Sequence, residues 1–83
     1  MMTIQAKFIS SELVGKLRDG AYELPDGATV SALMEEAQLE ANHTLTDQQK
    51  NSCVFVFDNS PASYDTKLRD GGKLRVMFKI LGG

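Results

Sequence analysis

The sequence predicts an α+β fold in which one helix covers one face of a single sheet. Residues 3–8 and 73–81 alternate apolar and polar side chains, which is the period of half-buried strands. Residues 30–41 instead place apolar side chains at helical spacing. An apolar helix stripe and one apolar sheet face are buried together when they pack against each other. The chain of 83 residues is long enough for one domain, so we assign residues 1–83 to a single domain.

The first two strands are expected to form a hairpin. Ile4, Ala6 and Phe8 share one face of the first strand, which we expect over residues 3–8. A short second strand is expected over Ala21–Leu24, directly before the turn-forming residues Pro-Asp-Gly.

The helix is expected to begin after Thr29, a residue type whose side-chain oxygen caps helix N-termini. No acidic or amide residue stands three positions later, so we expect no full capping box. Residues 42–52 contain one large apolar side chain, Leu45, and are expected to form a surface loop. The apolar stripe of the helix consists of Val30, Leu33, Met34, Ala37 and Ala41.

The second half of the chain is expected to complete the sheet. Val54–Phe57 is a continuous apolar run, which is typical of a strand buried on both faces near the sheet centre. A short strand is expected around Tyr64 and Asp65, followed by a hairpin turn at residues 70–72. The helix between the first and last strands is long enough to permit their parallel pairing. That arrangement is the β-grasp, a mixed sheet of four to five strands packed on one helix.

Charge and composition exclude several classes of protein. Nine basic and eleven acidic residues give a net charge of −2, which does not favour nucleic acid as a partner. The single cysteine, Cys53, cannot form an internal disulfide, and no Cys/His cluster has metal-ligand spacing. No apolar run is long enough for a membrane span or a signal peptide, so we expect a cytoplasmic protein with no membrane association.

The sequence offers little material for catalysis. Cys53 and His43 would need a third orienting group to act as a thiolate pair, and we favour a buried cysteine and a solvated helix-end histidine instead. Glu35 and Glu36 are adjacent, so on a helix they diverge by about 100° and cannot readily share a proton or a metal. We therefore expect no metal site and no enzyme activity from this domain alone.

The C-terminal part of the sequence is basic and ends in two glycines. Residues 67–83 contain five basic side chains and only one acidic one, Asp70. These cations either protect a water-facing edge or face of the sheet, or steer the C-terminus toward an acidic partner. Two terminal glycines occur by chance in roughly one chain in 200. Since glycine has no Cβ, Gly82-Gly83 can pass through a narrow tunnel and present the carboxylate of Gly83 to an enzyme, unless the glycines are simply a frayed end.

The order of elements and the Gly-Gly end resemble the MoaD/ThiS family of ubiquitin-like sulfur carriers. Residues 24–33, Leu-Pro-Asp-Gly-Ala-Thr-Val-Ser-Ala-Leu, resemble the entry of that family into its helix. Residues 64–74, Tyr-Asp-Thr-Lys-Leu-Arg-Asp-Gly-Gly-Lys-Leu, resemble the turn before its last strand. The length and the loop before the helix are more similar to the molybdenum-cofactor carrier than to the thiazole carrier. The sequence departs from the family at Asp58, Gly72 and Phe78-Lys79, where asparagine, an acidic residue and two prolines are frequent.

This resemblance implies a protein cosubstrate with no permanently bound cofactor. An E1-like adenylyltransferase would use ATP to adenylate Gly83, and a persulfide donor would convert the adenylate to a thiocarboxylate. In the molybdenum branch, the large subunit of molybdopterin synthase would accept this sulfur. The alternatives are a carrier for thiamine thiazole or another thiolation pathway, a ubiquitin-like protein modifier, and a passive β-grasp interaction module.

The same resemblance suggests which residues meet the partners. Large apolar side chains near a functional terminus suit a docking surface. Met77 and Phe8 are candidates for this surface, although the face of Phe8 equally suits the core. The expected tail contacts are Phe78, Ile80, Leu81 and Gly82, with the carboxylate of Gly83 as the reacting group and Gly82-Gly83 as a flexible tail.

Overall fold

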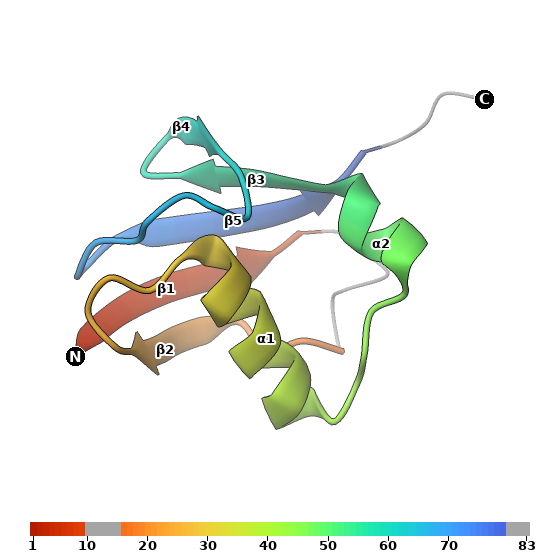
Figure 1. Cartoon of the computed structure of the whole chain (residues 1–83), viewed down its shortest axis with the longest axis horizontal. Coiled ribbons are helices and arrows are strands. Elements are labelled where there is room, and N and C mark those ends of the chain that lie inside the picture. The colour runs from red at the N-terminus through yellow and green to blue at the C-terminus, as the bar shows by residue number, and fades with distance from the viewer. Residues whose placement is uncertain (10–15, 80–83) are drawn as a thin grey trace.

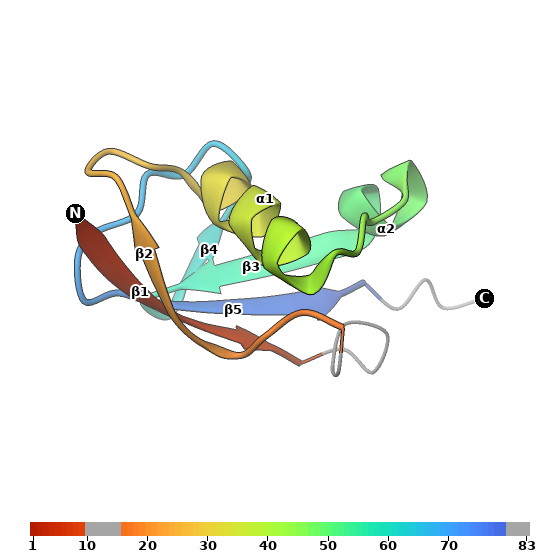
Figure 2. The same cartoon turned by 90° about the horizontal axis from the view of Figure 1, so that it is seen from below.

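The computed structural model describes residues 1–9 and 16–79, which form one five-stranded sheet and two helices (Figure 1). Figure 2 shows the long helix α1 lying across one face of the sheet. The strand order is β2-β1-β5-β3-β4. In chain order the elements are β1 (Met2–Phe8), β2 (Gly20–Leu24), α1 (Val30–Ala41), α2 (Asp47–Ser52), β3 (Cys53–Phe57), β4 (Ser60–Ala62) and β5 (Lys73–Phe78).

The centre of the sheet confirms the predicted β-grasp. β1 and β5 run parallel, with Gln5 opposite Lys73 and Phe8 opposite Val76. The other three strand pairs are antiparallel, and the predicted hairpin between β1 and β2 is one of them. The excursion through α1 is what makes the parallel pair possible, because tight turns join only antiparallel strands.

The core lies between α1 and one face of the sheet, as the two apolar patterns predicted. Four of the five stripe residues are buried, and the fifth, Ala41, packs at the margin of the core. Burial of this stripe against the alternate side chains of the strands supplies the main stabilisation of such a domain. The largest fully buried side chains are Tyr22, Phe8, Ile4, Leu33, Met34, Leu74, Val30 and Val76.

Helix α1 begins at the predicted residue but is capped in a different way. Thr29 is the N-cap, yet its side chain makes no capping hydrogen bond. The N–H groups of Val30 and Ser31 instead donate to the carbonyls of Thr66 and Tyr64, each at 3.0 Å. The loop after β4 therefore caps this helix, which is a long-range contact that local sequence does not reveal.

The prediction of a loop over residues 42–52 is wrong for its second half, which forms α2. Thr46 Oγ1 accepts from the N–H of Gln49, and Gln49 Oε1 accepts from the N–H of Thr46. These reciprocal bonds make a capping box. All six residues of α2 are polar, so apolar periodicity could not reveal it, whereas the Thr-x-x-Gln pattern was the available signal. Leu45, which is buried, anchors the chain just before this helix.

Two predictions about the strands after α2 need correction. β3 is an internal strand beside the central β5, as predicted, but it is not buried on both faces. Its core face consists of Cys53, Phe55 and Phe57. The short strand is Ser60–Ala62 and not the segment at residues 64–65. Asp58 and Asn59 join β3 to β4 with positive φ angles of 50° and 66°, which is the backbone of a tight two-residue hairpin.

The predicted turn at residues 70–72 exists, but it does not join a hairpin. β5 pairs with β1 and β3, whereas β4, the preceding strand, pairs only with β3. Gly71 has a φ of +80°, a conformation that glycine adopts without strain. Gly72 is buried, and a Cβ at this position would overlap the ring of Phe57 and approach the Arg69 carbonyl to 3.0 Å.

We expect Gly72→Ala to lower the free energy of unfolding by about 1–3 kcal/mol, because the added methyl group must displace a buried ring or the backbone. The measurement is urea denaturation followed by circular dichroism. Gly71→Asn is the matched control and should cost less, since the site has open space and asparagine tolerates positive φ. Equal stability of Gly72→Ala and the unmodified protein would contradict this packing argument.

Candidate functional site

The sheet face opposite α1 carries the main candidate site. We define the open-face patch as the side chains of Ile9, Val54, Val56 and Met77 with those of Lys7, Lys73 and Arg75. The apolar members are half-buried or exposed, and Ile9 is 45% exposed. A contiguous apolar surface of this kind is typical of a protein–protein contact.

Strand register brings the apolar part of the patch together. Val54 is directly opposite Met77 across the β3–β5 pair. Ile9 follows Phe8, which is opposite Val76, so Ile9 extends toward Met77. The sequence does not single out the two valines, because a continuous apolar run predicts a strand that is buried on both faces. Since side chains alternate along β3 and Phe55 and Phe57 face the core, Val54 and Val56 face the open side of the sheet.

Three cations surround this apolar surface. Lys7 is directly opposite Arg75 in the parallel β1–β5 pair, and Lys73 is opposite Gln5. The patch therefore carries three positive charges beside its apolar side chains. The side chain of Arg75 donates to a neutral group, Asn59 Oδ1, at 2.8 Å. These basic side chains lie on a face and not at an edge, since β5 is central.

The cations also line a hollow of about 510 Å³ between β1 and β5. Its lining includes Lys7, Lys73 and Arg75, with Asp19 at one side. Asp19 is already engaged, because its Oδ1 accepts from the backbone N–H of Phe8 at 2.8 Å. The hollow therefore presents a positive surface, which complements acidic groups on a partner.

Two aspartates fix the start of β5. Asp58 Oδ1 accepts from the N–H of Lys73 at 2.9 Å, and its Oδ2 accepts from Arg69 at 3.1 Å. Asp70 Oδ1 accepts from the N–H of Thr3 at 2.8 Å. The bond from Lys73 to Asp58 joins β5 to the β3–β4 turn, and the bond from Thr3 to Asp70 joins β1 to the turn before β5. Together they hold the central strand in register with both neighbours.

The far end of β5 is held as well. Phe78 is opposite Cys53 in the β3–β5 pair and packs, half-buried, against the core. The N–H of Lys79 donates to the Ser52 carbonyl at 2.7 Å, which extends the pairing one residue past the strand. The predicted tail residues Ile80, Leu81, Gly82 and Gly83 lie outside the described residues.

Of the remaining predicted contacts, the structure separates Met77 from Phe8. Met77 lies on the open face beside Val54, where a partner can reach it. Phe8 is 1% exposed and belongs to the core, so the prediction of a partner contact at Phe8 is wrong. The two residues occupy opposite faces of the sheet, because side chains alternate along strands.

Cys53 and His43 do not form a catalytic pair in the described part of the chain. The Cys53 thiol donates to the Gln49 carbonyl at 3.3 Å, and burial raises its pKa, which makes it a poor nucleophile. His43 is half-buried, and its Nε2 is covered and has no hydrogen-bond partner among the described residues. The expectation of a solvated histidine is therefore wrong. Tyr64 packs edge-on against Phe55 and donates to the Lys50 carbonyl at 2.7 Å.

Among residues 1–9 and 16–79, no group of three or more His, Cys, Asp or Glu side chains is arranged to hold a metal ion. In the same ranges, neither helix combines the length and apolar character needed to cross a membrane.

Known structures share this architecture at low sequence identity. A protein assigned as molybdopterin converting factor subunit 1 from Pyrococcus furiosus matches 96% of this chain and 100% of its own, with a TM-score of 0.69 and 22% identity. Small archaeal modifier protein 1 of Haloferax volcanii matches 96% and 100%, with a TM-score of 0.72 and 14% identity. The HVO 2177 protein of that organism matches 99% and 87%, with a TM-score of 0.73 and 22% identity. No protein-family model and no curated protein matches the sequence.

These likenesses establish the fold class. The chain has the ubiquitin-like β-grasp fold, and its sheet and helix cover the full length of the first two of those proteins. Fold likeness at such identities does not by itself assign a function.

The hydrogen bonds to Asp58 predict a pH-dependent contribution to stability. The backbone N–H of Lys73 is the main cause that lowers the pKa of Asp58, and the Arg69 guanidinium adds to it. A lowered pKa stabilises the folded state above the unfolded carboxyl value of about 3.9, and this is lost as pH falls through the folded value. We therefore expect the difference in Tm between the unmodified protein and Asp58→Asn to shrink below about pH 4.

Arg69→Gln is the matched control for this prediction. It removes the guanidinium and leaves the N–H of Lys73 in place, so most of the pH dependence should persist. The measurement is thermal unfolding of all three proteins across the acid range. A Tm difference between the unmodified protein and Asp58→Asn that stays constant with pH would rule out this role of the carboxylate.

Proposed function

We propose that this protein is a sulfur carrier of the MoaD/ThiS type, whose reacting group is the carboxylate of Gly83. The observation that carries the proposal is the match of nearly the whole chain to a molybdopterin converting factor subunit 1. The motifs at residues 24–33 and 64–74 support it, because they border the helix and the last strand of the observed fold.

The chemistry would occur on partner enzymes and not on this domain. An E1-like adenylyltransferase would join the Gly83 carboxylate to the α-phosphate of ATP and release pyrophosphate. The terminal sulfur of a persulfide donor would then attack the acyl adenylate and displace AMP, which gives an acyl disulfide between donor and carrier. A thiol of the donor or its enzyme would attack the donor sulfur of this disulfide, which releases the thiocarboxylate of Gly83 and leaves the donor as a disulfide. Adenylation is needed because a carboxylate has no good leaving group, and bound partners supply the positioning that a small domain lacks. We expect these steps in the cytoplasm, with no cofactor resident on the carrier.

The open-face patch would dock the carrier onto these partners. Its apolar residues provide area to bury, and Lys7, Lys73 and Arg75 provide complementarity to an acidic surface. The backbone is fixed as far as Lys79 by its bond to Ser52, and Gly83 is four residues further along the sequence. Four extended residues span at most about 14 Å, which sets how far the carboxylate can reach from the docked sheet.

The sulfur acceptor we favour is the large subunit of molybdopterin synthase. The supporting observation is the description of the Pyrococcus furiosus protein as a molybdopterin converting factor subunit. A thiamine thiazole pathway or another thiolation pathway would use the same carrier chemistry with a different acceptor.

The second candidate function is that of a ubiquitin-like protein modifier. The likeness to small archaeal modifier protein 1 favours it. In this case lysine side chains of target proteins would attack the same activated carboxylate, and an isopeptide bond would form with loss of AMP. A passive interaction module would use the open face without any reaction at Gly83.

Intact-mass spectrometry tests the carrier chemistry directly. After incubation with an E1-like partner, ATP and a persulfide donor, we expect one oxygen to be exchanged for sulfur, localised to Gly83 by fragmentation. A variant that lacks Gly83 is the control and should stay unmodified. An unchanged mass with an active partner would overturn the carrier proposal, and covalent ladders on denaturing gels would favour the modifier instead.

Substitutions on the open face test the docking surface. We expect Arg75→Glu to slow association with the E1-like enzyme about tenfold at low salt, and the effect should shrink at high salt. Lys67→Glu makes the same charge change at an exposed residue outside the patch and is the matched control. Met77→Asp should weaken binding at both salt concentrations, because it removes apolar contact. Equal association rates for the two charge variants would show that the open face is not the docking surface.

A further inference from the structure

A second surface feature lies at the opposite edge of the sheet from β4. β2 is an edge strand, with β1 on one side and no strand on the other within the described residues. Two hollows, of about 440 and 380 Å³, lie where this edge meets α1. Both are lined by Arg18 and Glu40, so this pair of side chains stands between them. We call the two hollows together the β2–α1 groove.

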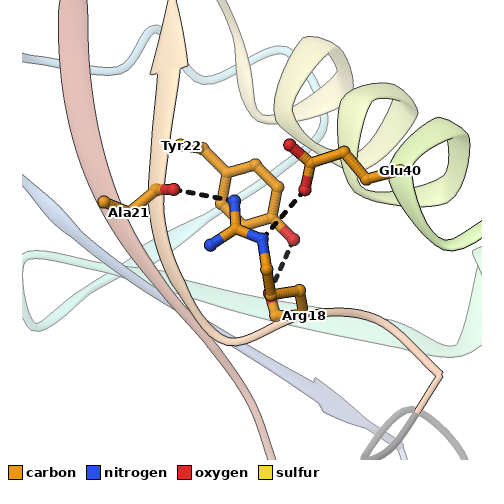
Figure 3. Close-up of polar contacts among 4 residues, drawn as sticks. All are labelled: Arg18, Ala21, Tyr22 and Glu40. Carbon is orange, nitrogen blue, oxygen red and sulfur yellow. Dashed lines mark hydrogen bonds and ion pairs between the residues drawn. The ribbon is translucent and has the colours of Figure 1, made fainter.

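The Arg18 guanidinium crosses this groove from the strand to the helix (Figure 3). Its Nη2 donates to the Ala21 carbonyl at 2.8 Å, and its Nε donates to Glu40 Oε2 at 3.0 Å. The guanidinium carbon lies 4.3 Å from the centroid of the Tyr22 ring, which is a cation–π distance. Ala21, Tyr22 and Glu40 thus form a cradle for a guanidinium group, and the chain fills it with its own arginine.

The backbone of β2 offers pairing groups beside this cradle. The Ala21 carbonyl accepts from Arg18 and therefore points away from β1. Because hydrogen-bonding directions alternate along a strand, the N–H and carbonyl of Glu23 point the same way. An exposed edge of this kind is a template for an added strand. Arg18 occupies one of its acceptors, which shields the edge while the groove is empty.

The charge of the groove selects the kind of partner. Glu23, Glu36 and Glu40 line the larger hollow, where Arg18 is the only cation among the lining residues. If Arg18 moved away, three carboxylates would surround the cradle without a compensating charge. An incoming basic side chain would restore the balance, and arginine fits because the existing contacts already match its planar donors. The Arg18–Glu40 pair is partly exposed, and such pairs contribute little net stability, so displacement is feasible.

We propose that the β2–α1 groove is a docking site for an extended peptide segment that carries an arginine. The segment pairs with the outer edge of Ala21–Glu23 and places its guanidinium on Glu40, the Ala21 carbonyl and the Tyr22 ring. Arg18 acts as an internal competitor that leaves the cradle when the peptide binds. This site is separate from the open-face patch and does not depend on chemistry at Gly83.

An NMR titration of the full-length ¹⁵N-labelled protein tests the site. The probe is the blocked peptide Thr-Val-Arg-Val-Thr, and its matched control has Glu in place of Arg. We expect the arginine peptide to shift the amides of Ala21 and Glu23 and the Nε signal of Arg18, and to slow hydrogen exchange at those two amides. The glutamate peptide should leave these signals unchanged.

Variants of the cradle give opposite expected changes in affinity. Arg18→Ala removes the competitor and should tighten peptide binding at least threefold, whereas Glu40→Gln should weaken it at least threefold. Glu35→Gln removes a carboxylate from α1 outside the groove and should leave the affinity unchanged. Thermal unfolding of each variant verifies that the fold is retained, and backbone shifts of Arg18→Ala locate any local rearrangement.

Several results would overturn the proposal. Equal binding of both peptides would remove the arginine requirement, and shifts confined to Lys7 and Arg75 would place the peptide on the open face. Unchanged affinity of Arg18→Ala would show that Arg18 does not compete. Sedimentation of Arg18→Ala as a dimer, with Ala21 and Glu23 protected in the absence of peptide, would show that the edge pairs with a second copy of this chain instead.

Discussion

The parallel pairing of β1 with β5 is the constraint on which the rest of the structure depends. It joins strands from the two ends of the described chain, so the chain must cross one face of the sheet through α1 before β5 can run beside β1 in the same direction. Asp58, in the turn after β3, accepts from the N–H of Lys73 and so fixes the beginning of β5 against β3. Asp70, in the turn before β5, accepts from the N–H of Thr3 and so fixes that end of β5 against β1. The register set by these bonds decides which side chains of the central strand face α1 and which face the open side of the sheet.

One consequence is that the two faces of the sheet have different roles. The face under α1 is filled by alternate strand residues and supplies the stability. The other face is left with half-buried apolar side chains and with Lys7 opposite Arg75. Accessible apolar side chains beside charges of one sign are typical of a surface that a partner of opposite charge covers. The composition of this face therefore supports the proposed docking role.

The edges of the sheet are treated differently from its open face. β4 is three residues long and contains Pro61, which limits pairing by another chain. β2 is longer and is covered instead by one side chain, Arg18, which holds the strand, the Tyr22 ring and α1 together. The Arg18 side chain can rotate away from the edge, whereas Pro61 is part of the β4 backbone and cannot. The outer edge of β2 is therefore shielded by Arg18 but can still pair with an added strand when Arg18 moves.

The sequence was enough to predict the fold class, because the alternation over residues 3–8 and 73–81 and the apolar stripe of residues 30–41 are local patterns. Their apolar sides are buried together when the helix packs on one face of the sheet. The sequence also placed the N-terminus of α1 correctly. It did not reveal α2, whose six residues are polar, or the capping of α1 by the loop after β4. The outward orientation of Val54 and Val56 follows from the tertiary structure, since a continuous apolar run does not show which neighbouring elements will cover each face. The same holds for the Arg18 cradle, whose members are brought together by the packing of β2 against α1.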